Sequence, residues 1–386
     1  MDGIYQKSEN RVNKVMLVAN TDWYLYNFRL PLVEFLRQHD YNVVLVSPEG
    51  KYSTELSRAG HKWIPWNVSR KSTVPWGEGK ALSRLINIYR REKPDLVHHF
   101  TVKPVLYGSL AARAAGVKGI VNAITGLGYL FLSEEIKTRL IRQFVRRIYS
   151  YALNLRNCVV IFENDTDRQY FISEGLVSLE RTRLIEGVGV DTNFYSPMPE
   201  PPGEPVVIMP ARMLWDKGVG VLVGAAQILK ERGSQARVVL VGEPDAGNPT
   251  SIDEKTIRVW VKDGLVEWWG WREDMREVYA QCHIVTLPSF REGVPTVLLE
   301  AAATARPIIA TDVPGCRDVV EHGVNGLLVP PNDEAALAEA LLALIEDATL
   351  RRRMGAAGRQ RVMQKYSVLQ INTVTEEVYR SLLESH

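Results

Sequence analysis

The sequence predicts an α/β protein made of two doubly wound domains, each with a parallel sheet. Short apolar runs rich in β-branched residues alternate with amphipathic segments along the chain, as strands alternate with crossover helices. The length of 386 residues also suits two domains better than one.

The first half contains five apolar runs that predict strands buried on both faces. They are residues 14–20, 42–47, 95–100, 119–124 and 157–162. Amphipathic segments between them, such as 29–38 and 79–91, predict helices. The same alternation restarts with PVVIMP and continues through RVVLVGE, LVEWWGW, HIVTLPS and PIIATDV, which predicts a second α/β domain.

A proline-rich run, residues 196–205, separates the two halves. It has five prolines in ten residues, which excludes a helix interior or a central strand and suits a stiff connection. We therefore expect domains at 1–196 and 197–366, facing each other across a cleft. Open parallel sheets bind ligands beyond the carboxyl ends of their strands, so the functional residues should lie on those loops.

The composition is that of a soluble globular protein, with 46% hydrophobic and 24% charged residues. Three widely spaced cysteines suit a reducing cytosol. The polar N-terminal dozen residues have no signal-peptide pattern, and no apolar run is long enough to span a bilayer. We expect a cytoplasmic protein that is not integral to a membrane and has no nucleic acid partner.

A basic amphipathic helix is predicted over residues 136–151 (IKTRLIRQFVRRIYSY), where five Lys and Arg residues alternate with apolar ones. Such a helix suits the surface of an anionic membrane. It equally suits a helix with one core face and one solvated face. Peripheral attachment to the inner face of the cell membrane is one expectation, and it stays open at this point.

The segment LPSFREGVPTVLLEA predicts a strand that ends near Leu287, a loop with Glu292 and Gly293, and a helix that begins near Pro295. The free N–H groups and positive dipole of that helix start would favour a phosphate. Glu292 and Glu300 are eight residues apart, and carboxylates accept hydrogen bonds from sugar hydroxyls. The spacing alone also arises by chance in a charged chain.

A second loop, MPARMLWDKG, places Arg212 and Lys217 just after another predicted strand. Two cations there would clamp a leaving diphosphate. Exposed charges at a helix start would give the same pattern. The joint occurrence with the Glu292 loop favours the diphosphate interpretation.

The chain resembles the retaining glycosyltransferases grouped with sucrose and glycogen synthases, known as family 4 or group 1, over nearly its whole length. Four segments carry the resemblance: VGVDTNFYSP, ARMLWDKG, REGVPTVLLEA and TDVPGCRDVVEHGVNGLLVPPND. The resemblance implies the GT-B fold, in which two Rossmann-like domains face each other and the terminal helix, here about 367–386, completes the first.

The resemblance also implies roles for particular residues in the second domain, which would bind the nucleotide-sugar donor. Arg212 and Lys217 would bind the diphosphate, Glu292 and the loop of Gly293, Val294 and Pro295 would meet the sugar, and Glu300 would hold the ribose. Gly270 would form a wall around the nucleobase, and Trp271 would either stack on a uracil or pack in the protein. The cations replace a divalent ion, so we expect no metal and no cofactor, the UDP-sugar being a substrate.

A competing metal motif is the D-x-D of Asp165 and Asp167, which follows an apolar strand. Another class of glycosyltransferases holds manganese with this pattern. The alternative is a helix cap, with Asn164 or Asp165 at the start of a helix that ends before Gly175. We favour the cap.

The acceptor is expected in the first domain. His99 and Lys103 follow a predicted strand, and Thr125 and Gly126 follow the next, where many relatives carry a histidine that this chain lacks. A strand-end histidine is also often a packed core residue. NAITGLG and HHFTVKP resemble, more narrowly, transferases that add N-acetylhexosamine to a polyprenyl-diphosphate-linked saccharide.

We therefore predict a retaining transferase that moves a sugar, an N-acetylhexosamine by this narrower resemblance, from a UDP-sugar to a lipid-linked saccharide. No side-chain base is evident at the reacting centre, and the family resemblance implies that the donor phosphate takes the acceptor proton. Two rivals stay open: a nucleotide-sugar epimerase of similar shape, and a non-catalytic nucleotide-sugar-binding protein.

Overall fold

The computed structural model describes residues 12–68, 75–125 and 146–384, and the chain divides into two compact units. Unit 1 comprises residues 1–185 and 372–386, and unit 2 comprises residues 186–371. Each unit is built on one parallel sheet, so the expected α/β class with two parallel sheets is confirmed. Most of the basic segment 136–151 and Gly126 lie outside the described residues.

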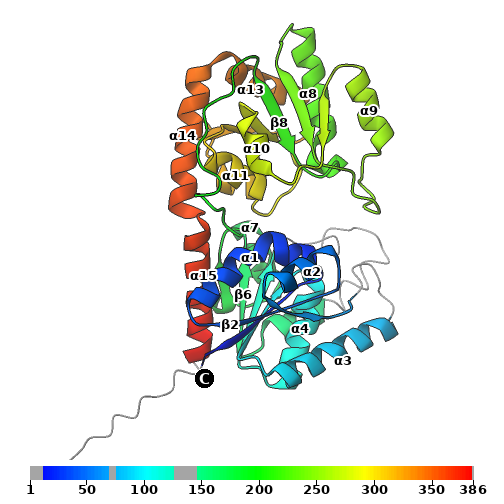
Figure 1. Ribbon diagram of the computed structural model, residues 1–386, viewed down its shortest axis with the longest axis vertical. Helices are drawn as coiled ribbons and strands as arrows, with labels where there is room; N and C mark the ends of the chain where they lie inside the picture. Colours follow the sequence, from blue (N-terminus) through cyan, green and yellow to red (C-terminus); the bar gives the residue numbers. More distant parts are fainter. Residues whose placement is uncertain (1–11, 69–74, 126–145, 385–386) are drawn as a thin grey trace, which may run out of the picture. The chain divides into compact units, whose positions relative to one another are not determined.

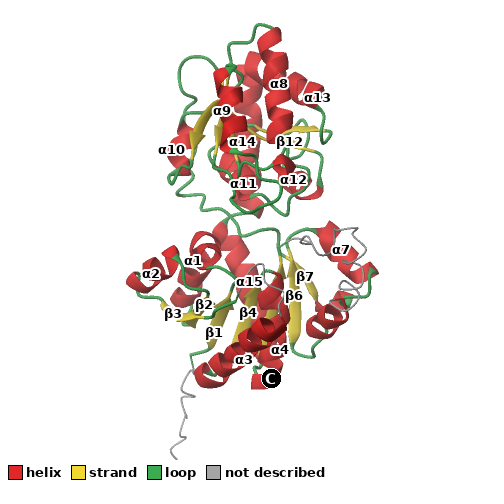
Figure 2. Cartoon of the chain, turned by 90° about the vertical axis from the view of Figure 1, so that its right-hand side faces the viewer, coloured by secondary structure: helices red, strands yellow, loops and turns green. Residues whose placement is uncertain are grey.

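The sheet of unit 1 has seven parallel strands in the order β3-β2-β1-β4-β5-β6-β7 (Figure 2). The strands are β1 (Lys14–Val18), β2 (Asn42–Ser47), β3 (Lys62–Pro65), β4 (Leu96–Phe100), β5 (Gly119–Ile124), β6 (Cys158–Phe162) and β7 (Thr182–Leu184). Five of them are the predicted strands. The two that were missed, β3 and β7, are short edge strands with exposed residues, which lack a continuous apolar signal.

Six helices of unit 1 are described in full, together with a 3₁₀ turn at Leu179–Arg181. They are α1 (Asp22–Gln38), α2 (Lys51–Arg58), α3 (Pro75–Glu92), α4 (Val102–Ala115), α7 (Asp165–Ser173) and α15 (Val368–Glu384), most of which belongs to this unit. α15 docks through buried side chains, because Tyr379 Oη lies 2.6 Å from His98 Nδ1 on β4 and Glu376 pairs with His39. The terminal helix therefore completes unit 1, as the family resemblance implied.

The sheet of unit 2 has six parallel strands in the order β10-β9-β8-β11-β12-β13. They are β8 (Val206–Pro210), β9 (Arg237–Val241), β10 (Glu267–Gly270), β11 (Ile284–Leu287), β12 (Ile308–Thr311) and β13 (Gly326–Val329). The order reverses between β8 and β11, which is where an open parallel sheet leaves a crevice at its carboxyl edge.

The helices of unit 2 are α8 (Val219–Glu231), α9 (Glu254–Lys262), α10 (Met275–Ala280), α11 (Thr296–Ala303), α12 (Pro314–Val319), α13 (Glu334–Glu346) and α14 (Ala348–Lys365), with a 3₁₀ turn at Trp215–Lys217. The most extensive contacts among these helices are those of α8 with α13 and of α11 with α14 (Figure 1). The core between them and the sheet consists of fully buried aliphatic side chains, such as Ile208, Leu222 and Leu298.

The division between the units lies at residue 185, eleven residues before the expected end of the first domain at 196. Val190 pairs with the end of α14, since its N–H donates to Tyr366 O at 2.9 Å and its carbonyl accepts from Val368 N. The proline-rich run is likewise held within unit 2, where Arg351 pairs with Glu200 at 2.9 Å. Its stiffness therefore serves unit 2 rather than the connection between units.

Candidate active site

The loop after β11, residues 288–295, ends at the start of α11. Pro295 is the residue before the helix, with φ −73° and ψ 116°, and the helix begins at Thr296. The N–H groups of Leu298 and Leu299 both donate to Pro295 O. The N–H groups of Thr296 and Val297 have no carbonyl partner within the helix. Positive potential therefore gathers where the sequence predicted a phosphate site.

The first turn of α12 packs closely against this loop. A side-chain carbon added at Gly315, in the first turn of α12, would lie 1.3 Å from the carbonyl oxygen of Gly293. Only glycine allows this approach. Val294 is buried and packs near Gly187. A ligand would therefore contact the backbone of this part of the loop rather than the Val294 side chain.

The loop after β8, residues 211–218, is joined to the 288–295 loop. Gly218 has φ +76°, and a side-chain carbon there would lie 1.9 Å from Pro288 O. Phe290 N also donates to Asp216 O at 3.0 Å. These contacts bring two loops that are at least 70 residues apart in sequence into one site.

Lys217 and Glu292 meet directly as a result. Lys217 Nζ lies 2.5 Å from Glu292 Oε1, with side chains 21% and 10% exposed. The sequence placed both residues at the donor, but it did not predict this ion pair. A partly enclosed pair of this kind is strong enough to orient both groups and still open enough for a ligand to reach them.

Arg212 lies on the same loop but is more exposed. Its guanidinium pairs with Asp245 at 2.6 Å, and its side chain is 55% exposed. Asp245 was not among the predicted residues. It follows β9, so the rule that ligand residues follow the carboxyl ends of strands would have found it.

Glu300 lies on α11 and is held by two tyrosines. Tyr279, on α10, donates its hydroxyl to Glu300 Oε2 at 2.8 Å, and Tyr195 also hydrogen-bonds to this carboxyl group. Burial raises the pKa of Glu300 to about 7, while the hydrogen bonds from Tyr279 and Tyr195 lower it. Neither tyrosine was predicted, because Tyr279 lies within α10 and Tyr195 lies eleven residues beyond the end of β7, so neither stands at the end of a strand.

Gly270 and Trp271 stand at the carboxyl end of β10. Gly270 has φ +68°, and its carbonyl accepts from Gly242 N at 2.8 Å, which ties this turn to the end of β9. The Trp271 side chain is 55% exposed, so it is not the packed core residue of the alternative interpretation. Its ring is available to a planar ligand.

The predicted acceptor residues in unit 1 fall into different surroundings. His99 is fully buried, with Nδ1 2.8 Å from Asn122 Oδ1 and Nε2 2.9 Å from Tyr89 Oη, and burial lowers its pKa to about 4. Both ring nitrogens are therefore engaged inside the protein, and the structure does not support the prediction that His99 contacts the acceptor sugar. Lys103 is ion-paired with Glu78 at 2.7 Å, and Thr125 is half-buried at the end of β5.

The D-x-D of Asp165 and Asp167 forms the first turn of α7. Asn164 is the cap, since its side chain accepts from Asp167 N at 2.8 Å, and Gly175 follows the helix with φ +65°. The favoured interpretation as a cap is thus confirmed. In the part of the chain that the structure describes, no three His, Cys, Asp or Glu side chains form a metal-binding group.

Two units, each built on a parallel α/β sheet, are the architecture of the GT-B class of glycosyltransferases. Residues 14–164 match the family described as "Glycosyl transferase 4-like", and residues 204–347 match "Glycosyl transferases group 1". The chain belongs to the group 1 glycosyltransferases. Within the described ranges, no helix has the length and apolarity needed to cross a membrane.

Relatives and solved structures agree over nearly the whole chain. N,N'-diacetylbacillosaminyl-diphospho-undecaprenol alpha-1,3-N-acetylgalactosaminyltransferase of Campylobacter jejuni is 27% identical, over 88% of this chain and 91% of that protein. The capsular polysaccharide biosynthesis glycosyltransferase CapM of Staphylococcus aureus is 26% identical, over 91% and 93%. The crystal structure of Anabaena Alr3699/HepE with UDP has a TM-score of 0.78 at 22% identity, and the match covers 95% of this chain and all of that one.

Proposed function

We propose that this glycosyltransferase moves an N-acetylhexosamine from a UDP-sugar to a polyprenyl-diphosphate-linked saccharide during synthesis of a cell-surface glycan. The observation that carries the donor half is the Lys217–Glu292 pair beside the start of α11, which joins a cation, a carboxylate and free N–H groups in one place. A sugar diphosphate needs all three: a cation and N–H groups for its phosphates, and a carboxylate for its hydroxyls.

The remaining donor contacts come from the 211–218 loop, from α11 and from the end of β10. Arg212 adds a second cation, Glu300 accepts from the ribose hydroxyls, and the exposed Trp271 stacks on the uracil beside Gly270. The two cations neutralise the leaving diphosphate, so the proposed reaction needs no divalent metal. UDP as the carrier is supported by the Anabaena structure, which was solved with UDP.

The proposed reaction retains the anomeric configuration. The bond between the sugar C1 and the diphosphate oxygen breaks, and Lys217 and Arg212 stabilise the negative charge that develops on that oxygen. The acceptor hydroxyl oxygen bonds to C1 from the same face, and its proton passes to the departing phosphate oxygen. Glu292 holds the sugar hydroxyls and orients Lys217 during this step.

The acceptor half rests on the relatives and is assigned to unit 1. The Campylobacter relative is named for an undecaprenol-diphosphate-linked acceptor and for N-acetylgalactosamine transfer, and CapM is named for capsular polysaccharide synthesis. Lys103 and Thr125 stay candidate acceptor residues. Attachment through residues 136–151 to an anionic membrane would place the enzyme beside such a lipid.

A panel of nucleotide sugars and polyprenyl-linked saccharides, incubated with and without a chelator, tests this proposal. Mass and anomeric analysis should show one sugar added with retention of configuration, unaffected by chelation. A converted free donor without any acceptor would indicate an epimerase, and tight donor binding without transfer or hydrolysis would indicate a binding protein. Loss of transfer on chelation would contradict the metal-independent reaction.

A further inference from the structure

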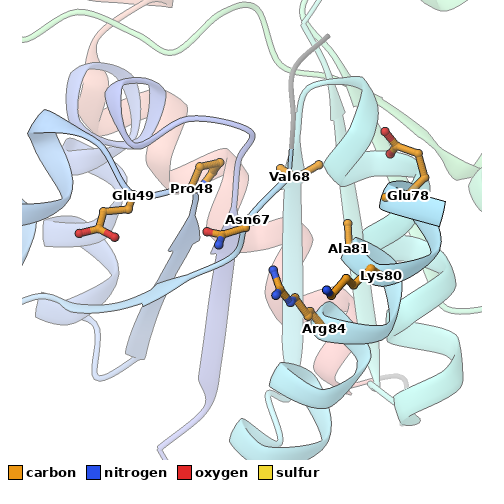
Figure 3. Close-up of a pocket in the computed structure, with 9 residues that line it drawn as sticks. Pro48, Glu49, Asn67, Val68, Glu78, Lys80, Ala81 and Arg84 are labelled. Atoms are coloured by element: carbon orange, nitrogen blue, oxygen red, sulfur yellow. The ribbon is translucent and has the colours of Figure 1, made fainter. Parts of the chain in front are cut away.

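A cavity of about 430 Å³ opens in unit 1 beside the N-terminal half of α3 (Figure 3). Its volume is in the range of ligand pockets, about 300–1,000 Å³. It is lined by residues that follow β2 and β3 and by the first turns of α3, namely Pro48, Glu49, Asn67, Val68, Gly77, Glu78, Lys80, Ala81 and Arg84. The cavity therefore lies at the carboxyl edge of the sheet, where parallel sheets bind ligands.

Two of the residues that line this cavity, Lys80 and Arg84, are cations. Lys80 and Arg84 are one helical turn apart on α3, so their side chains lie on the same face. Among the described residues, no hydrogen bond or ion pair engages Lys80, Arg84 or Asn67, which faces them from the strand side. Their hydrogen-bonding groups are therefore free to bind a ligand.

The two carboxylates of the lining do not cancel this charge. Glu78 is already neutralised by Lys103, whose Nζ lies 2.7 Å from Glu78 Oε1. Figure 3 shows the carboxylates of Glu78 and Glu49 directed away from the nitrogens of Lys80 and Arg84. The helix dipole of α3 adds positive potential near its first turns. The cavity thus favours an anion.

The spacing of the cations selects the kind of anion. Side chains one turn apart on a helix have Cβ atoms about 5–6 Å apart, which suits two adjacent phosphates better than a single carboxylate. Arginine binds phosphate oxygens in a bidentate manner, lysine adds a point charge, and the Asn67 amide can donate to a further oxygen. The buried Val68 and Ala81 make an apolar wall beside these polar groups.

We propose that this cavity binds the diphosphate of the lipid-linked acceptor, through Lys80, Arg84 and Asn67. The proposal rests on the proposed function, because that function supplies the diphosphate-bearing acceptor. Lys103 then acts indirectly, since its ion pair holds the Glu78 carboxylate away from the phosphates. The donor diphosphate keeps its own cations, Arg212 and Lys217, in unit 2.

The test compares the double variant Lys80→Ala/Arg84→Ala with the matched control Arg58→Ala/Arg91→Ala. The control removes the same charge from exposed cations of unit 1 that are paired with glutamates, at 72% and 66% exposure. Both proteins are assayed with a polyprenyl-diphosphate saccharide and with the same saccharide as an alkyl glycoside without phosphate. Pyrophosphate is also titrated calorimetrically into each protein after saturation with UDP, which occupies the donor site.

The cavity variant should raise the acceptor KM at least tenfold for the diphosphate-linked saccharide, and leave unchanged the KM for the UDP-sugar and for the alkyl glycoside. The control should match the unaltered enzyme. An unchanged acceptor KM overturns the proposal, and so does an equal loss with both acceptors. If the unaltered enzyme transfers to no lipid-linked acceptor, the proposed function fails, and the titration decides the cavity. Pyrophosphate binding that only the cavity variant loses supports an anion site, whereas equal binding or no binding overturns it.

Discussion

The hydroxyl of Tyr279 lies 2.8 Å from Glu300 Oε2 and donates to a carboxyl group whose pKa burial raises to about 7. Tyr195 donates to the same group, and both hydrogen bonds favour the ionised form. Glu300 is therefore balanced between its protonated and ionised states near neutral pH. The ionised carboxylate accepts hydrogen bonds at both oxygens, whereas protonation turns one of them into a donor and weakens its contact with the ribose hydroxyls in the proposed donor complex.

Donor affinity should accordingly depend on pH, and Tyr279→Phe should shift that dependence. In the unaltered enzyme, the KM for the UDP-sugar should rise as the pH falls through about 7. Loss of the Tyr279 hydrogen bond raises the pKa of Glu300 further, so the variant should have a several-fold higher KM at pH 7 and recover by pH 9.

The measurement is the donor KM of both proteins from pH 6 to pH 9. Tyr195→Phe should shift the profile in the same direction, because Tyr195 hydrogen-bonds to the same carboxyl group. Burial and the neighbouring carboxylates of Glu300, Asp274 and Asp191 raise the pKa of Tyr195, so its hydroxyl stays protonated over this pH range. A Tyr279→Phe enzyme with a raised KM at every pH would point to a merely structural role for this hydroxyl.

Lys217→Ala should lower kcat at least tenfold, because it removes the more enclosed cation from the leaving diphosphate and leaves Glu292 unpaired. Arg212→Ala should also lower turnover at least tenfold. Steady-state kinetics on folded variants measures this, with melting curves as the check on folding. Full turnover in both variants would contradict the donor assignment.

Trp271→Ala should raise the KM for the UDP-sugar roughly tenfold, since stacking of a base on an aromatic ring contributes about 1–3 kcal/mol. The exposed ring contributes little to the fold, so the melting temperature should change little. Trp271→Phe is the matched control, because it keeps a stacking surface. Equal KM values for all three proteins would exclude the stacking contact.

Gly315→Ala should destabilise unit 2 by about 1–3 kcal/mol, the usual cost of overpacking, because the added carbon would lie 1.3 Å from Gly293 O. Gly358→Ala is the control within a helix, where the nearest atom is 3.5 Å away and alanine is the better helix former. Urea unfolding of both variants measures the difference. Equal stability would mean that the contact between α12 and the 288–295 loop is not tight.

Local sequence patterns were enough to predict much of the fold and of the donor site. The buried strands, the α/β class and the loops that follow β8, β10 and β11 could be predicted, because apolar runs, glycines and prolines act on the backbone near them. The position of a loop after a strand also indicates which edge of a parallel sheet it occupies. That is why Arg212, Lys217, Glu292 and Trp271 could be assigned to one edge before any contact was known.

Contacts between distant segments were decided only by the tertiary structure. The sequence does not show that Lys217 pairs with Glu292, that Asp245 pairs with Arg212, or that Tyr279 reaches Glu300, since each depends on how separate loops and helices pack. Packing also buried His99 and kept the proline-rich run inside unit 2. The sequence by itself determined which residues stand at the ligand edges, and packing decided which of them meet, because side-chain pairing depends on distances that sequence spacing does not contain.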